Sequence, residues 1–218
     1  MHFQDRAEAG QFLARDLVHL RDIHGLIVLA LPRGGVPVGF EIARALHAPL
    51  EAFVVRKLGV PGQEELAMGA VASGGVRVLN PEVVAALGHF ASIAIERVTV
   101  REKEEVRRRE EQYRGGRPFP ELEGRTVILV DDGLATGATM RAAARAVRAR
   151  EPYRLIIAVP VAPQSSCDEM RSEADEVVCA LTPQPFFGVG QFYCDFQQTT
   201  DEEVRELLAR SNIEGASS

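Results

Sequence analysis

The stretch of the chain that decides its fold reads Val127-Ile128-Leu129-Val130-Asp131-Asp132-Gly133-Leu134-Ala135-Thr136-Gly137-Ala138-Thr139. Its apolar residues have the length of a buried strand, which ends in two acids, and a turn of small residues then opens a helix near Gly137. In an open α/β sheet, ligands bind at the carboxyl ends of the strands, where the first turn of a helix offers unpaired N–H groups to a phosphate. Paired acids would repel a bare phosphate, so we expect them to hold the neighbouring hydroxyls of a ribose, directly or through Mg²⁺. The run therefore predicts a site for a sugar phosphate.

The order of side chains in this run resembles the signature of the type I phosphoribosyltransferases. These enzymes bind 5-phosphoribosyl 1-diphosphate (PRPP), transfer its ribosyl phosphate to a nitrogenous base and release pyrophosphate. The resemblance covers residues 127–139 and implies that Asp131 and Asp132 hold the ribose hydroxyls and, together with Asp195, Mg²⁺. It also implies a loop that binds the 5′-phosphate, made of Ala135, Thr136, Gly137, Ala138 and Thr139.

The rest of the chain alternates apolar runs of strand length with helical patterns, which is typical of a parallel sheet with right-handed crossovers. We therefore expect an α/β fold, a mainly parallel twisted sheet flanked by helices, with a small hood region, as in the type I phosphoribosyltransferases. Residues 1–218 would form a single domain. Its parts are predicted as a core at about 24–182, a hood at about 182–198, a flexible loop at about 58–69 and a helical insertion at about 80–114.

The apolar runs predict strands at 26–31, 50–55, 68–73, 76–79, 127–130, 153–159 and 176–181, and Gly74-Gly75 predicts a hairpin turn between the third and the fourth of these. Helical patterns lie at 5–21, 36–46, 92–113, 137–150, 166–174 and 200–211, and a short helix begins at Asn80-Pro81. The first and last of these helices begin with capping-box patterns. The helix at 92–113 alternates Glu and Arg in its second half, which predicts a solvated face with i,i+4 pairs rather than a nucleic-acid patch.

Two basic segments lie between the first predicted strand and the flexible loop. Pro32-Arg33-Gly34-Gly35 follows that strand, and its glycines allow the backbone to approach phosphate oxygens that Arg33 can bind through its planar fork. Arg56-Lys57 ends the next strand and precedes Pro61-Gly62, an arrangement that resembles the adenine phosphoribosyltransferases. The resemblance implies that the pyrophosphate is bound by Arg33, Gly34, Gly35, Arg56 and Lys57, and that Arg33 and Lys57 assist catalysis.

The loop at about 58–69 would fold over the site and exclude water from a reactive intermediate. Glu65, or its neighbour Glu64, could then reach the acceptor base as a general acid or base, whereas a loop glutamate is more commonly only solvated.

A loop rich in Pro, Gly and aromatic residues, 182–193, follows the last core strand. Adjacent phenylalanines in such a loop suit a wall on which a flat heterocycle stacks, although Phe residues usually pack into a core. The loop resembles the hood of the 6-oxopurine enzymes, which implies an acceptor site made of Phe186, Phe187, Val189 and Phe192. Those enzymes usually have an Asp where this chain has Ala135 and a Lys before the hood, whereas no Lys follows Lys103 here. The hood therefore does not identify the base.

The composition restricts the class of protein. A net charge of −6 argues against general nucleic-acid binding, and no apolar run or leader pattern predicts a membrane span or a signal peptide. Cys167, Cys179 and Cys194 are odd in number and widely spaced, so we predict no disulfide framework and no metal knuckle, and a cytoplasmic location follows as the simplest expectation. We also expect a homo-oligomer.

The sequence leaves three functions open. The first is a phosphoribosyltransferase that uses Mg²⁺ and PRPP with a purine-like base, as in purine salvage. The second is a regulatory protein that binds PRPP or a nucleotide without turnover, which the basic pair, the loop and the hood make less attractive because a PRPP sensor needs no acceptor wall. The third is hydrolysis or phosphorolysis of a nucleotide.

Overall fold

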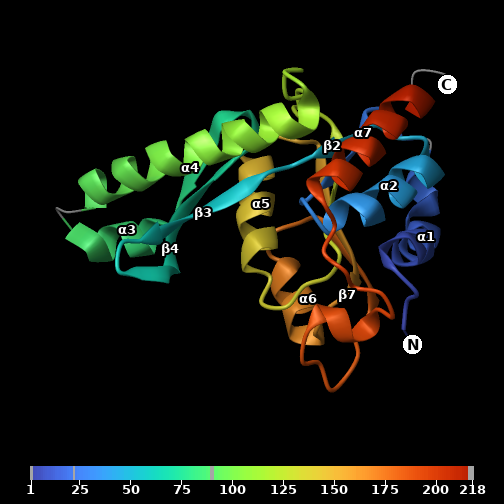
Figure 1. Cartoon of the computed structure of the whole chain (residues 1–218). Coiled ribbons are helices and arrows are strands. Elements are labelled where there is room, and N and C mark those ends of the chain that lie inside the picture. The colour runs from blue at the N-terminus through green and yellow to red at the C-terminus, as the bar shows by residue number, and fades with distance from the viewer. Residues whose placement is uncertain (1, 22, 89–90, 216–218) are drawn as a thin grey trace.

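Helices cover both faces of a five-stranded parallel sheet, and an arm projects from this body to one side (Figure 1). The computed structural model describes residues 2–21, 23–88 and 91–215, and of residues 65, 91 and 212–215 only the backbone. The arm consists of a three-stranded antiparallel sheet with helices α3 (Pro81–Leu87) and α4 (Ala91–Arg114). The α/β fold with a mainly parallel, helix-flanked sheet is therefore confirmed.

The parallel sheet has the strand order β2-β1-β6-β7-β8. Its strands are β1 (Leu26–Ala30), β2 (Leu50–Ala52), β6 (Thr126–Val130), β7 (Arg154–Val161) and β8 (Glu176–Leu181). Strands β1 and β6 pair in parallel from Leu26 opposite Thr126 to Ala30 opposite Val130. Because the two strands end in register, the turn after β1 and the acids after β6 start side by side.

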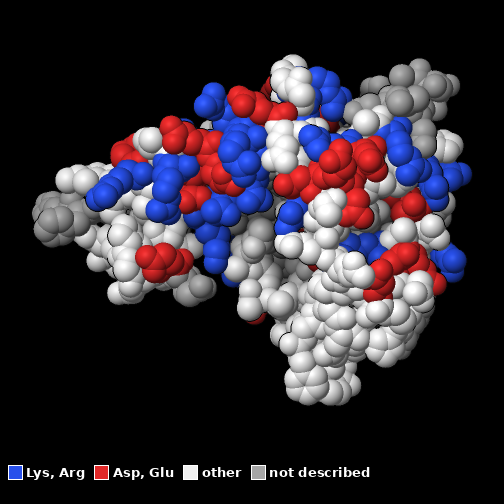
Figure 2. All heavy atoms as spheres, in the orientation of Figure 1, with Lys and Arg blue, Asp and Glu red and all other residues white. Residues whose placement is uncertain are grey.

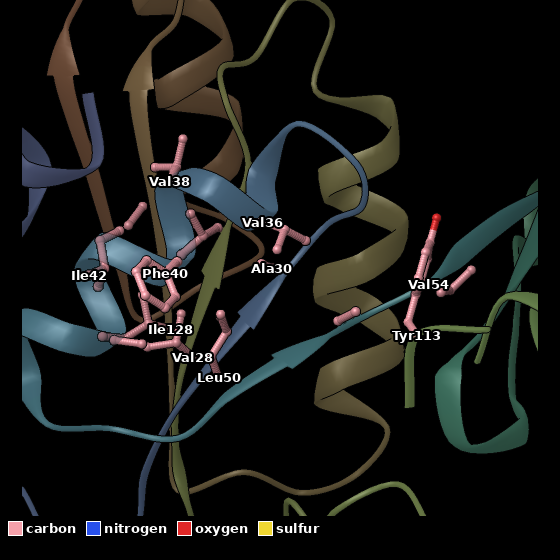
Figure 3. Close-up of a cluster of buried hydrophobic side chains, with 14 of the residues drawn as sticks. Val28, Ala30, Val36, Val38, Phe40, Ile42, Leu50, Val54, Tyr113 and Ile128 are labelled. Atoms are coloured by element: carbon pink, nitrogen blue, oxygen red, sulfur yellow. The ribbon is translucent and has the colours of Figure 1, made fainter. Parts of the chain in front are cut away.

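The two faces of this sheet pack against different helices. Alternate residues of β1 point to opposite sides, so Val28 and Ala30 join one apolar cluster while Ile27 and Leu29 join another. The first cluster is covered by α1 (Arg6–Leu17), α2 (Gly35–Leu46) and α7 (Asp201–Gly215). Figure 3 shows its centre, where Phe40 and Ile42 of α2 lie over the sheet. The second cluster is covered by α5 (Ala138–Arg148) and α6 (Gln164–Met170).

Residues 58–69 form part of a β-hairpin and not an irregular loop, and the predicted flexibility of this segment stays a prediction. Strand β3 (Val55–Val60) pairs antiparallel with β4 (Gln63–Ala72), and Pro61-Gly62 forms the turn between them. Strand β4 pairs in turn with β5 (Val76–Leu79) across a short 3₁₀ turn, Ser73–Gly75, as the Gly74-Gly75 pattern predicts. The predicted strand at 50–55 divides between two sheets, since β2 ends at Ala52 and Arg56-Lys57 lie within β3 of the arm.

The ion pairs of α4 confirm the prediction for its Glu- and Arg-rich half only in part. Arg108 and Arg109 both bind Glu105, at 2.8 and 2.7 Å, and Figure 2 shows the two charges intermixed over this helix. However, the face is not wholly solvated. Arg114 has a side chain only 3% exposed and lies 3.2 Å from Glu51 of β2, so the helix also anchors the arm to the body.

The capping box of α7 is confirmed, because the Thr200 N–H donates to the Glu203 carboxylate and the Glu203 N–H donates to the Thr200 hydroxyl. The box of α1 is confirmed in part: Asp5 accepts a hydrogen bond from the Glu8 N–H, but Glu8 accepts its bond from the N–H of Gln4 and not of Asp5. Two further 3₁₀ turns occupy Val18–Leu20 and Val189–Phe192. In the part of the chain described, no helix is both long and apolar enough to cross a membrane.

The prediction of no disulfide is wrong, because Cys167 of α6 and Cys179 of β8 are joined. Spacing gave no indication of this bond, since the crossover from α6 into β8 decides that the two residues meet. Cys194 is free and exposed rather than packed. The cysteines therefore no longer support a reduced compartment, and a cytoplasmic location stays a prediction.

Candidate active site at the end of strand β6

The acids after β6 lie directly against the Pro-Arg-Gly-Gly turn after β1. The Leu31 N–H donates to the Val130 carbonyl at 2.9 Å, which holds the two segments together. A Cβ on Gly34 would overlap the Asp132 carboxylate, with Cγ at 2.6 Å, and a Cβ on Gly35 would lie 3.0 Å from the Asp131 Cα. Both positions therefore require glycine, and the structure brings the two predicted segments into one site.

The two carboxyl groups have raised pKa values. Burial is the main cause for Asp131, and the neighbouring Asp132 charge raises its pKa further. The Asp132 N–H, at 2.9 Å from Asp131 Oδ1, offsets this only partly. Burial also raises the pKa of Asp132, although Arg6 opposes the shift. A desolvated acid pair of this kind favours a bound cation or hydrogen-bond donors supplied by a ligand.

The turn after the acids ends in an open helix start. Gly137 has φ 68° and precedes α5 without any side-chain cap, so the first N–H groups of this helix have no capping side chain. Ala135 and Thr136 are exposed on this turn, whereas α6 supports it from behind. The Ser166 hydroxyl donates to the Ala135 carbonyl at 2.7 Å. The predicted phosphate loop thus has the backbone arrangement that an anion needs.

The hood packs on the same turn. A Cβ on Gly133 would lie 2.6 Å from a methyl group of Val189, so the two loops are in close contact. Phe192 is only 6% exposed and stacks on Phe186 with ring centroids 5.4 Å apart. Phe187, by contrast, is 86% exposed. Of the predicted acceptor residues, Phe192 therefore packs as an ordinary core aromatic, and Phe187 is the ring that solvent can reach.

The predicted cations are dispersed. Arg33 stays beside the turn, with its guanidinium 3.9 Å from Asp201 of α7. Arg56 is bound by Glu102 of α4 at 2.8 Å, on the arm, and its binding of pyrophosphate stays a prediction. Lys57 lines a cavity of about 230 Å³ that also contains Ala138, the first residue of α5. The backbone of Glu65 lies in β4, and its side chain lies outside the described part of the structure.

Asp195 does not join the acid pair. Its carboxylate accepts a hydrogen bond from the Gln197 N–H at 3.0 Å and lines a separate groove with Asp5 and Glu203. Among the residues described, no group of three or more His, Cys, Asp or Glu side chains could hold a metal ion. A magnesium ion at Asp131 and Asp132 would therefore need further oxygen ligands from water or a substrate.

Two residues that lie at the acid pair are not predicted by any sequence pattern. Arg6 binds Asp132 from the first turn of α1, and the Tyr193 hydroxyl donates to the Asp132 carbonyl at 2.7 Å. Neither position follows a motif that marks a ligand site. They reach the acids because the first residues of the chain pair with the hood, as the Cys194 N–H to Phe3 carbonyl bond shows.

Comparison with known proteins agrees with this geometry. The family description of the phosphoribosyl transferase domain matches residues 4–197, which is nearly the whole chain. The chain belongs to the phosphoribosyl transferase domain family. The match begins just before α1 and ends in the hood, so it includes the acid pair, the Pro-Arg-Gly-Gly turn and Arg6.

Two relatives are similar to this chain over most of its length. A Mycobacterium tuberculosis protein, from strains CDC 1551 and H37Rv, is 48% identical over 210 residues and is provisionally named a phosphoribosyl transferase. The alignment covers 96% of this chain but 47% of the mycobacterial protein, so the chain spans about half the length of the curated relatives it matches. The crystal structure of TT1426 from Thermus thermophilus is 44% identical, with a TM-score of 0.86 over 96% of this chain and 99% of that one.

Proposed function

We propose that the protein transfers the 5-phosphoribosyl group of PRPP to a ring nitrogen of a flat, uncharged, purine-like base and releases pyrophosphate. The observation that supports this most strongly is the contact between the acid pair and Gly34-Gly35, next to the open start of α5. These three features would bind the ribose hydroxyls, the pyrophosphate and the 5′-phosphate of one PRPP molecule. Holding both phosphate ends fixes C1′ between the nucleophile and the leaving group.

Mg²⁺ fits the acid pair as a partner of PRPP. Asp131 is a partly buried carboxylate that accepts a hydrogen bond from the backbone N–H of Asp132, and Mg²⁺ in such sites is held by one or two carboxylates together with substrate phosphates. Asp131 and Asp132 would hold the ion, which would neutralise charge on the departing pyrophosphate. Arg33 and the Gly34-Gly35 backbone would bind the same group as its charge develops. Lys57 would do so from the arm.

The acceptor site would lie against the hood. Residues 177–194 contain no charged side chain, and Figure 2 shows an uncharged surface where the hood forms the lower end of the molecule. An anionic acceptor would need a cation to replace its hydration there. The exposed Phe187 ring offers a stacking face instead, which supports a neutral heterocycle.

The test is a pyrophosphate-release assay with Mg·PRPP and a panel of bases that contains neutral purines, orotate and nicotinate. We expect release with at least one neutral purine and none with the two carboxylates. Turnover restricted to orotate or nicotinate would refute the choice of acceptor. Saturable PRPP binding without release would favour a regulatory protein, and cleavage of nucleoside monophosphates by water or by inorganic phosphate, without pyrophosphate, would favour the nucleotide-cleaving alternative. The expected homo-oligomer can be checked on the same preparation by light scattering.

A further inference from the structure

Arg6 makes a set of contacts that its position at the start of a helix does not require. Its Nε lies 2.8 Å from Asp132 Oδ2, and the two side chains are only 11% and 16% exposed. The same guanidinium donates to the Gln197 carbonyl at 2.7 Å. It also stacks over the Phe196 ring, with Cζ 4.0 Å from the ring centroid. Such a fork with three partners on two segments is held far more firmly than a surface arginine.

The carboxylate that Arg6 holds is fixed on its other side as well. Gly34 leaves room for the Asp132 carboxylate, and a Cβ at that position would also come 3.2 Å from the Arg6 Nε. The Tyr193 hydroxyl binds the Asp132 carbonyl. Asp132 is therefore enclosed by α1, the turn after β1 and the hood, two segments from the first part of the chain and one from its last part.

The two acids consequently differ in what they can offer a ligand. One oxygen of Asp132 is occupied by Arg6, whereas no side chain of opposite charge binds Asp131 in the described structure. We propose that Arg6 is a positioning residue of the PRPP site. It fixes the Asp132 carboxylate between the turn after β1, α1 and the hood, and leaves Asp131 as the principal ligand of the ribose. This inference rests on the proposed function, because it concerns the same PRPP site.

A double-mutant cycle tests whether Arg6 acts through Asp132. Calorimetric titration with Mg·PRPP would be compared for the wild type, Arg6→Gln, Asp132→Asn and the double variant. We expect each single substitution to weaken binding about tenfold, as for other residues that orient a ligating group, and the double variant to bind no more weakly than either single one. Arg15→Gln is the matched control, because Arg15 lies on the same helix but is exposed.

A conservative variant separates geometry from charge. Arg6→Lys keeps the positive charge but cannot reach Asp132 and the Gln197 carbonyl together or stack its plane on Phe196, so we expect it to restore only part of the affinity. Full recovery of Mg·PRPP affinity in Arg6→Lys would mean that a positive charge near Asp132 is sufficient, and the positioning role would be overturned. If the fold-losses of affinity in the two single variants multiplied in the double variant, the positioning role would also be overturned, since Arg6 would then act independently of Asp132.

Thermal unfolding of the same four proteins without PRPP measures whether Arg6 and Asp132 are coupled in the free protein. We expect the melting temperatures to show the same non-additivity, because the contact exists in the free protein. If the wild type did not bind PRPP at all, the proposed function would fail and the PRPP role of Arg6 with it. If the wild type bound PRPP but the cycle were additive in both measurements, only the inference about Arg6 would fail.

Discussion

The turn after β6 and the arm both carry acidic side chains, but the pKa values of Asp131 in the turn and Glu105 in the arm are shifted in opposite directions. Asp131 is desolvated beside another acid, which raises its pKa, whereas Glu105 on α4 receives hydrogen bonds from Arg108 and Arg109 that lower its pKa to about 2. Both arginines that bind Glu105 lie on the same helix, within one turn of it. At the turn the charge of Asp131 is left without an ionic partner among the described residues, so it is available to a ligand at a cost in stability.

The largest effect that would test this contrast is expected from Asp131→Asn. We expect it to weaken Mg·PRPP binding by roughly 100-fold, because a hydrogen bond or ion contact to a charged group contributes up to about 3 kcal/mol. The melting temperature at pH 7 should stay equal or rise, since a raised carboxyl pKa means that stability is lost as the pH rises through it. Asp16→Asn, on the exposed side of α1, is the control. A fall in melting temperature with unchanged affinity would place Asp131 in a structural role.

The next largest effect concerns the support behind the turn. Removing the Cys167–Cys179 bond with Cys179→Ala should lower the free energy of unfolding by about 3 kcal/mol, because the unfolded chain regains the freedom of the closed loop. For a chain of this size that corresponds to roughly 6–12 °C in melting temperature. Differential scanning calorimetry of the variant, and of the wild type with and without a reductant, measures it. Equal wild-type melting points with and without reductant would contradict the prediction.

Gly34→Ala should have a smaller effect on stability, since an added methyl group must displace the Asp132 carboxylate. We expect about 1–3 kcal/mol of destabilisation, as for other overpacked positions, with weaker Mg·PRPP binding. Chemical denaturation and calorimetric titration give the two quantities. Gly188→Ala is the control for stability, because nothing lies near its Cβ and its φ of 167° suits any residue. Equal effects of both substitutions would mean that the contact with Asp132 is not the cause.

The smallest effect is expected on the arm. Glu105→Gln should change the free energy of unfolding by no more than about 0.5 kcal/mol, because ion pairs at the surface are screened and partly replaceable by water. The lowered pKa means that this contribution is present above pH 4.5 and is lost only as the pH falls toward 2. The free energies of unfolding of wild type and variant, measured by urea denaturation, should therefore differ little, and this difference should be the same at every pH between 5 and 8. A loss comparable to that of Gly34→Ala would remove the contrast between arm and turn.

Contiguous patterns predicted much of the molecule. The strand that ends in Asp131, the turn to α5, the Pro-Arg-Gly-Gly turn and the Gly74-Gly75 hairpin all lie where local sequence indicated them. The hairpin at 55–72 was not predicted, because its Gly and Pro residues form a β-turn between paired strands, and pairing is not visible in local composition. For the same reason the sequence did not indicate that Arg56 lies on a strand of the second sheet.

The sequence by itself determined the chemistry that runs along the chain: an apolar strand, two acids, and a small-residue turn that leaves helix N–H groups open. Only the tertiary structure decided which of those acids is engaged by the protein, because Arg6 and Asp132 are 126 positions apart and meet through the packing of α1 and the hood. The same holds for the bond between Cys167 and Cys179 and for the burial of Phe192. Backbone preference and hydrophobic periodicity act between near neighbours, whereas burial, pKa and partner choice depend on residues that folding brings together.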